Sequence, residues 1–234
     1  MGTVPISRVL SYDYLVLVPA VAVLCNLAFV AFRRWRELLV FQVAGLVNLA
    51  AEVAMVGGGV RHLDTEDPLL RAMTLICLGW VTNGFLFALA FANVSQWLRR
   101  KGPLHYLVAV NAIFLIGLPL ASVDYGLLDG SVRTWRAMSQ GLLRLEPVAV
   151  FVLAAVVFWL GYRRLLWRLL LIGMLIDICF EARLFALGIR PVEQLDLLQA
   201  GTRVVFEMNL ALLAGFLVLK GIFGLKDYRD DRLS

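Results

Sequence analysis

The sequence predicts an all-α membrane protein with seven transmembrane helices. Of its 234 residues, 61% are hydrophobic and 17% are charged, and its mean hydropathy is +0.83, whereas soluble domains average roughly 45–50% apolar and 25% charged residues. Apolar runs of about 20 residues, the length that crosses a bilayer as a helix, follow one another along the chain. We therefore expect one membrane domain over 1–234 and no separate soluble catalytic domain.

Short polar segments separate the seven expected helices, which lie near 12–32, 38–60, 69–97, 104–126, 146–162, 165–188 and 195–219. The first run lacks a basic leader and a small-residue cleavage site, and it is longer than the apolar core of a signal peptide, so we expect a permanent helix there. The polar segment 127–146 contains three arginines and Trp135. We expect it to form an outer loop with a short interfacial helix, placed to cap a cavity.

Positive charges indicate how the helices are oriented. Thirteen of the 22 lysines and arginines lie at helix ends that share one side of the membrane, seven lie on the other side, and two lie within helices. Because cytoplasmic loops carry an excess of such residues, we expect the N-terminus outside or in the lumen and the C-terminus in the cytoplasm. Topology thus explains the net charge of +5 better than nucleic-acid binding does, and we expect no nucleic-acid partner.

The residue types that are missing exclude several cofactors. The three cysteines sit in apolar runs without CxxC spacing, which argues against a disulfide framework and a zinc site. His62 and His105 are lone residues at helix ends, so neither bis-histidine haem ligation nor a multi-histidine metal site can be built. The three lysines sit at the cytoplasmic edge, whereas a retinal protein needs one in the middle of its seventh helix. We therefore expect no metal or cofactor.

The chain resembles itself when it is shifted by 129 positions. Asn48–Glu52 then aligns with Asp177–Glu181, and Gly59–Arg61 aligns with Gly188–Arg190. In a parallel repeat of three helices, one linking helix keeps both halves in the same orientation. We expect such a three-plus-one-plus-three arrangement, whose first half, linker and second half lie at about 12–97, 104–126 and 146–222. Chance similarity between leucine-rich helices is the alternative.

Six charged residues lie inside the expected spans, where each costs roughly 2.5–3.5 kcal/mol on insertion scales; they are Glu52, Asp177, Glu181, Arg183, Arg203 and Glu207. Spacings of four residues place them in polar stripes that must face the bundle interior. One interpretation is a set of structural ion pairs. Glu52, however, has no cation within a turn on its own helix, and an unpaired carboxyl in apolar surroundings keeps its proton, because burial disfavours the charged form. Such an acid suits proton-coupled transport or general-acid catalysis on an apolar substrate.

The segment Asn48-Leu49-Ala50-Ala51-Glu52 resembles the Asn-Phe-Ala-Trp-Glu signature on the second helix of the integral-membrane terpene cyclases. These are small seven-helix proteins of fungal meroterpenoid and indole-diterpene pathways, with relatives in bacteria. Asn26, the basic turn at 33–36 and Glu207 fill three further places of the family pattern. The chain departs from that pattern at Ala51, where the family has Trp, and at Glu207, where it usually has Asp.

The resemblance implies a metal-independent isomerase or lyase that protonates an epoxide or terminal olefin of a prenylated lipophilic substrate and so triggers carbocation cyclisation. By matching position, Glu52 would be the general acid or part of its relay, Glu207 its acidic partner, and Asn48 the residue that positions one of them. The side chains expected to line the substrate site are Asp177, Glu181, Arg203, Asn83, Trp80 and Phe206. An apolar bundle within membrane lipid would shield the cation from water, and aromatic faces would stabilise it.

Two other functions remain open at this point. A small-solute transporter would line a midplane site with Glu52, Arg203 and Glu207. A membrane sensor would use its tail, 220–234, to contact a cytoplasmic partner. A transporter should have a continuous polar path to both faces, whereas a cyclase should have a pocket that is apolar around its acids.

Overall fold

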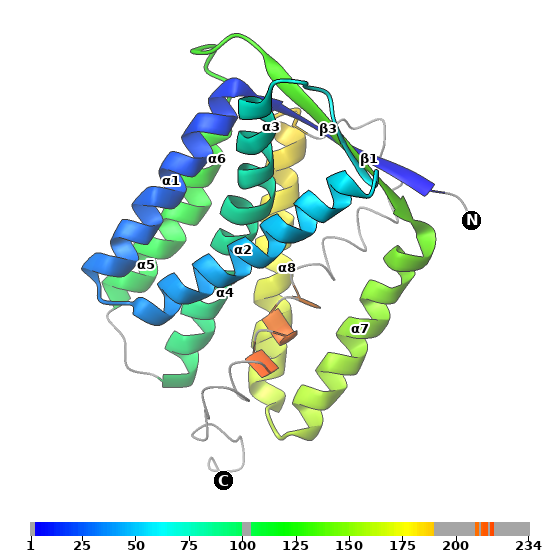
Figure 1. Cartoon of the computed structure of the whole chain (residues 1–234). Coiled ribbons are helices and arrows are strands. Elements are labelled where there is room, and N and C mark those ends of the chain that lie inside the picture. The colour runs from blue at the N-terminus through cyan, green and yellow to red at the C-terminus, as the bar shows by residue number, and fades with distance from the viewer. Residues whose placement is uncertain (1–2, 100–103, 190–208, 211, 215, 218–234) are drawn as a thin grey trace.

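The structure of the protein, a computed structural model, describes residues 3–99, 104–189, 209–210, 212–214 and 216–217 (Figure 1). Its helices are α1 (Tyr12–Ala31), α2 (Trp35–Gly57), α3 (Pro68–Leu75), the π-helix η1 (Ile76–Val81), α4 (Thr82–Arg99), α5 (Leu104–Ala112), the π-helix η2 (Ile113–Gly117), α6 (Leu118–Ala121), α7 (Gln140–Trp159) and α8 (Arg163–Ala186). Its strands are β1 (Thr3–Ser11), β2 (Arg61–Leu63) and β3 (Ser131–Ser139).

The described chain is mostly helical, and three of its helical stretches are long and apolar enough to cross a membrane. They are Tyr12–Ala31, Trp35–Gly57 and Pro68–Asn93; two shorter apolar helices are Val108–Ala121 and Pro147–Trp159. Large apolar side chains such as Val23, Leu24 and Leu27 on α1 are more than half exposed, as expected for a surface that faces lipid rather than water. The expectation of a mostly helical chain with apolar helices of membrane-spanning length is thereby confirmed, whereas the expectation of an all-α chain is wrong, because three strands form as well.

Most expected helices appear with small shifts of their ends. The run 69–97 is one continuous helical stretch made of α3, η1 and α4, and the run 104–126 corresponds to α5, η2 and α6 and ends at Ala121. The run 38–60 corresponds to α2, which ends at Gly57 because the chain turns at Gly59 with a φ of +69°. Most of 195–219 lies outside the described residues.

The expected outer loop at 127–146 is largely a β-strand and the start of a helix. β3 pairs antiparallel with both β1 and β2, giving a three-stranded sheet in the order β1-β3-β2, and α7 begins at Gln140, so no separate interfacial helix forms. Val132 and Thr134 are buried, whereas Ser131 and Arg133, which precede them, are exposed, which is the alternation of a half-buried strand. The sheet lies across one end of the helix bundle (Figure 1), here called the sheet end.

The turns that precede α2 and α8 have the same backbone hydrogen bonds. Before α2 these bonds join Phe32 to Ala28, Arg33 to Val30 and Arg34 to Phe29; before α8 they join Leu160 to Val156, Gly161 to Phe158 and Tyr162 to Val157. The turns that follow these two helices also match, because Gly59 and Gly188 both adopt a left-handed φ, of +69° and +66°. The two helical hairpins, α1–α2 and α7–α8, thus share local geometry at positions 128 or 129 residues apart.

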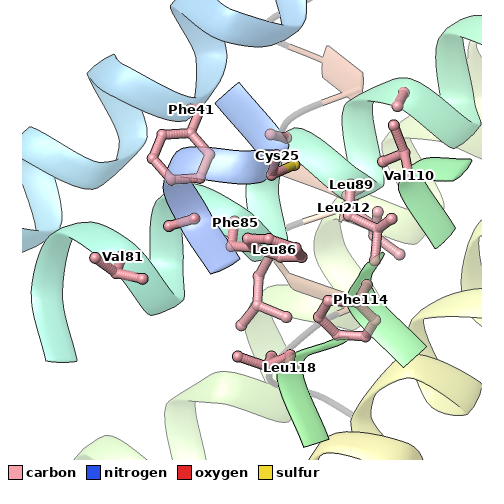
Figure 2. Close-up of a cluster of buried hydrophobic side chains, with 14 of the residues drawn as sticks. Cys25, Phe41, Val81, Phe85, Leu86, Leu89, Val110, Phe114, Leu118 and Leu212 are labelled. Atoms are coloured by element: carbon pink, nitrogen blue, oxygen red, sulfur yellow. The ribbon is translucent and has the colours of Figure 1, made fainter. Parts of the chain in front are cut away.

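Aliphatic and aromatic side chains together form a buried cluster within the bundle (Figure 2). Phe85 of α4 stacks on Phe114 of η2 with ring centroids 5.5 Å apart and meets Phe41 of α2 edge-on at 6.4 Å. Such arrangements favour aromatic pairs beyond the burial of their area. This core joins α2 and α4 to the helices that end at α6.

Glycines allow α2 to pack directly against η1 and α4. A Cβ atom on Gly79 would lie 2.6 Å from the Cα atom of Leu49, and one on Gly84 would lie 2.7 Å from the carbonyl oxygen of Phe41. Small residues promote close helix packing of this kind in membranes, where apolar burial alone does not drive helices together.

We predict that Gly79→Ala lowers the free energy of unfolding by about 1–3 kcal/mol, the usual effect of overpacking. The clash involves backbone atoms of Leu49, so no side-chain rotation relieves it. The matched control is Gly57→Ala on α2, where an added Cβ meets nothing within 4 Å. Thermal unfolding of both variants in detergent measures the difference, and equal stability of the two would contradict the close packing.

Candidate functional site

A buried charged cluster joins α2 to the sheet. Glu52 of α2 is 7% exposed, Arg61 of β2 is 6% exposed and Thr134 of β3 is fully buried. The Nη2 atom of Arg61 donates to Oε1 of Glu52 at 3.0 Å, its Nε contacts the other carboxylate oxygen, and its Nη1 donates to the Thr134 hydroxyl at 3.2 Å. The guanidinium therefore contacts both oxygens of the carboxylate and donates a charge-assisted hydrogen bond to one of them.

The expectation of an unpaired carboxyl at Glu52 is wrong. Its partner comes from beyond the helix, because the chain reverses at Gly59 and brings Arg61 back against the last turns of α2. Glu52 also lies nearer the helix end than expected, about 7.5 Å from Gly57 at a rise of 1.5 Å per residue. Since a guanidinium stays charged, Glu52 is one half of an ion pair.

Asn48, Trp80 and Asn83 lie where η1 and the start of α4 meet α2. The Asn48 amide donates to the carbonyl of Ala44 at 2.8 Å, within its own helix. The Trp80 indole packs on Gly45, the residue one turn before Leu49. The structure thus brings Trp80 alongside the predicted motif segment.

The Asn83 side chain donates hydrogen bonds to backbone carbonyls of the π-helix η1, which precedes it. A π-helix shifts the backbone bonding pattern by one residue, and the Asn83 amide donates to the carbonyls of Leu78 and Gly79 at 2.9 and 3.3 Å. The Thr82 hydroxyl donates to the carbonyl of Cys77 at 2.6 Å in the same way. These side chains satisfy backbone groups that a membrane cannot hydrate.

The remaining predicted site residues are placed only in part. Asp177 and Glu181 lie on α8, and their side chains are outside the described part of the structure. Arg203, Phe206 and Glu207 lie outside the described residues altogether. At 3.6 residues per turn, positions 177 and 181 lie about half a turn around the α8 axis from Cys179 and Arg183.

A cavity of about 210 Å³ lies beside α8 and is lined by Phe114, Leu115, Leu118, Pro119, Cys179 and Arg183. Its first four lining residues come from η2 and α6 and are apolar. Arg183 is 7% exposed, and its Nη1 donates to the hydroxyl of Ser122, just after α6, at 2.8 Å. None of these residues was expected to line a substrate site, although Arg183 had been recognised as a charge within a span.

Two buried acids escaped the sequence analysis because they lie in the first turns of helices. The Asp13 carboxylate on α1 accepts from the backbone N–H groups of Tyr125, Leu127 and Leu128 at 2.9–3.0 Å. Glu37, on the first turn of α2, is 5% exposed. A helix N-terminus favours negative charge, so neither acid needs a catalytic explanation.

Comparison of the chain with protein-family models, curated proteins and solved structures found no match in any of the three.

We predict that Glu52→Gln lowers the free energy of unfolding by about 3–5 kcal/mol, because it leaves the charge of Arg61 buried without its carboxylate. Replacing both partners, as Glu52→Leu with Arg61→Met, should restore most of that loss, since apolar pairs substitute well for buried ion pairs. Glu66→Gln, in an exposed loop, is the control for an acid-to-amide change. Chemical denaturation in detergent gives the free energy of unfolding of the wild type and of the three variants. A Glu52→Gln chain as stable as the wild type would show that the pair does not hold α2 to the sheet.

Proposed function

We propose that this membrane protein is a terpene-cyclase-like enzyme that acts on a prenylated lipophilic substrate within its helix bundle. The observation that carries the proposal is the buried carboxylate of Glu52, which stands at the acidic position of the family signature and is kept inside the bundle by Arg61. Gly79 packs on Asn48 and Leu49 of the segment that resembles the signature, and the next residue, Trp80, packs on Gly45 just before that segment. An aromatic ring therefore lies close to the segment, as carbocation chemistry would require.

The ion pair changes the roles that the resemblance implies. A carboxylate held by a guanidinium does not start a reaction by protonation, so we assign the proton to Glu207 and leave Glu52 as a fixed charge that orients the site. In the proposed reaction the Glu207 carboxyl gives its proton to the epoxide oxygen or terminal alkene carbon, and the carbon–oxygen or π bond breaks. Ring closures follow, and a proton lost from carbon returns to the carboxylate, so substrate and product are isomers.

The proposal includes seven spans with the sheet end outside the cell or in the lumen. The three candidate spans in the described residues, the matching turns before α2 and α8 and the matching glycines after them support a three-plus-one-plus-three repeat. The bias of Lys and Arg toward the opposite end supports the orientation.

A small-solute transporter is the second candidate, and the shared geometry of the two helical hairpins favours it, because many transporters are built from parallel repeats. The cavity beside α8 weighs in the other direction. Among the described residues its lining is apolar apart from Cys179 and Arg183, which suits a largely apolar ligand better than a small polar solute.

We predict that membranes containing the protein convert an epoxidised or olefinic prenyl substrate into isomers of equal mass and different retention, detected by liquid chromatography with mass spectrometry. Glu207→Gln should reduce turnover by about 10²-fold or more, the usual contribution of a general acid, without loss of folded protein. Glu66→Gln should leave turnover unchanged. Absence of any isomer with the wild-type chain would refute the cyclase, and full turnover by Glu207→Gln would remove this residue from its role.

For the orientation, we predict that a membrane-impermeant maleimide labels Asp129→Cys in intact cells but labels Arg163→Cys only after permeabilisation. Asp129 lies in the exposed loop before β3, and Arg163 begins α8 at the opposite end of the bundle. A chain with Cys25, Cys77 and Cys179 replaced by serine provides the background. The reverse labelling pattern would invert the proposed topology.

A further inference from the structure

The turn between α7 and α8 is strongly basic. It lies at the end of the bundle away from the sheet (Figure 1), and three exposed arginines follow it on α8, at positions 163, 164 and 168. The segment 147–176 contains these three arginines and no Lys, Asp or Glu, so it carries a net charge of +3. Such a concentration of positive charge at a membrane boundary attracts anions.

Two of these arginines present their guanidinium groups at the surface. The Cζ atom of Arg163 lies 4.6 Å from the ring centroid of Phe158, in the last turn of α7. The N–H donors of a guanidinium lie in its own plane, so a ring against its face leaves them able to bind an anion. Arg168 is exposed further along α8. Phosphate groups match guanidinium groups well, because they accept two parallel hydrogen bonds from one arginine.

Two exposed tryptophans lie beside these arginines in the sequence. Trp159 ends α7 and is 84% exposed, and Trp167 on α8 is 68% exposed. Trp167 follows Arg163 by four residues, so both lie on neighbouring positions of the helix surface. Tryptophan is enriched where lipid headgroups meet hydrocarbon. We therefore place the membrane boundary at this level of α8.

An apolar stripe continues along α8 from this boundary. Leu171, Leu175 and Ile178 are 55%, 49% and 43% exposed, and their spacing puts them on the same side of the helix as Arg168. The rise from position 168 to position 178 is about 15 Å, half of the roughly 30 Å hydrocarbon core of a bilayer. Cation, aromatic ring and aliphatic side chains thus follow one another over the depth of one leaflet, as the phosphate, glycerol and acyl chains of a phospholipid do.

We propose that this side of α8 binds an acidic phospholipid, whose phosphate contacts Arg163 and Arg168 and whose acyl chain lies along Leu171, Leu175 and Ile178. The local charge of +3 favours an acidic headgroup over a zwitterionic one, whose cationic group it would repel. In the proposed orientation this end of the bundle is cytoplasmic, and acidic lipids are concentrated in the cytoplasmic leaflet.

The proposal rests on the membrane placement of α8 that the proposed function includes, and not on the cyclase chemistry. It is tested by lipid binding alone, whereas the cyclase is tested by the formation of isomers. Failure of one therefore leaves the other standing.

The experiment measures lipid binding to the purified full-length chain in detergent by native mass spectrometry. Dioleoyl-phosphatidylglycerol and dioleoyl-phosphatidylcholine have the same tails, and only the former carries a net negative charge. The acidic lipid should bind at about tenfold lower concentration or less, because each arginine near an acidic headgroup contributes about fivefold. Equal binding of the two lipids to the wild-type chain would overturn the proposal, and this comparison needs no variant.

Arg163→Gln and Arg168→Gln should each weaken binding of the acidic lipid about fivefold and leave binding of the zwitterionic lipid unchanged. Two matched controls each remove one exposed arginine elsewhere: Arg133→Gln at the sheet end, and Arg33→Gln in the other hairpin turn at the same end as Arg163. Both should bind the acidic lipid as the wild type does. An equal loss in Arg33→Gln would indicate a diffuse effect of charge and not a site on α8.

The tail half of the site has its own test. Leu175→Ala removes apolar area from the stripe, so it should weaken binding of both lipids by a similar factor. A loss confined to the acidic lipid would contradict the placement of the acyl chain. A preference for the acidic lipid that survives the double change Arg163→Gln with Arg168→Gln would place that lipid elsewhere on the protein and refute the proposal.

Discussion

The contact between Arg61 and Glu52 ties the sheet to the helix bundle, and much of the described architecture depends on it. Arg61 grips the carboxylate of α2 and the hydroxyl of Thr134 on β3 at the same time. Since β3 also pairs along its whole length with β1, and β1 leads directly into α1, one buried guanidinium connects the ends of both N-terminal helices to the strand that precedes α7. Removing either Glu52 or Arg61 alone would leave the other charge buried without its partner, which is strongly destabilising.

Polar side chains within the helices follow the same logic of satisfying groups that lipid cannot solvate. The π-helical turn at η1 leaves carbonyls that Thr82 and Asn83 cover with their own side chains. In return, the turn places Gly79 against Leu49 and Trp80 against Gly45. The π-helical turn, Gly79 and the side chains of Thr82 and Asn83 therefore act together. They bring η1 into direct contact with Asn48 and Leu49 of α2.

Hydropathy predicted the helices well because a span must be long and apolar whatever it packs against, and α1 differs from its expected range by one residue. It missed β1 and β3 because these strands are short and mix apolar with polar residues. The buried position 134 of β3 is a threonine, so burial alternates along the strand where hydropathy does not. Helical spacing predicts that Glu52 is buried, but it relates only residues of the same helix. It therefore does not reveal Arg61, which lies beyond the end of α2. The Arg183 cavity could not be anticipated, because its walls come from segments about 60 residues apart that only packing brings together.

The sheet also shows why the two helical hairpins form one unit. β2, which follows α2, pairs with β3, the strand that precedes α7. Ile189, which follows α8, accepts a hydrogen bond from the backbone N–H of Val9 in β1, the strand that precedes α1. Each hairpin therefore ends on the strand that begins the other, as expected if the halves are related by a two-fold axis along the membrane normal. Neither hairpin contains both partners of its own strand pairing, so the sheet needs both halves of the chain. The same holds for the buried hydrogen bond from Arg61 to Thr134, which joins the two halves.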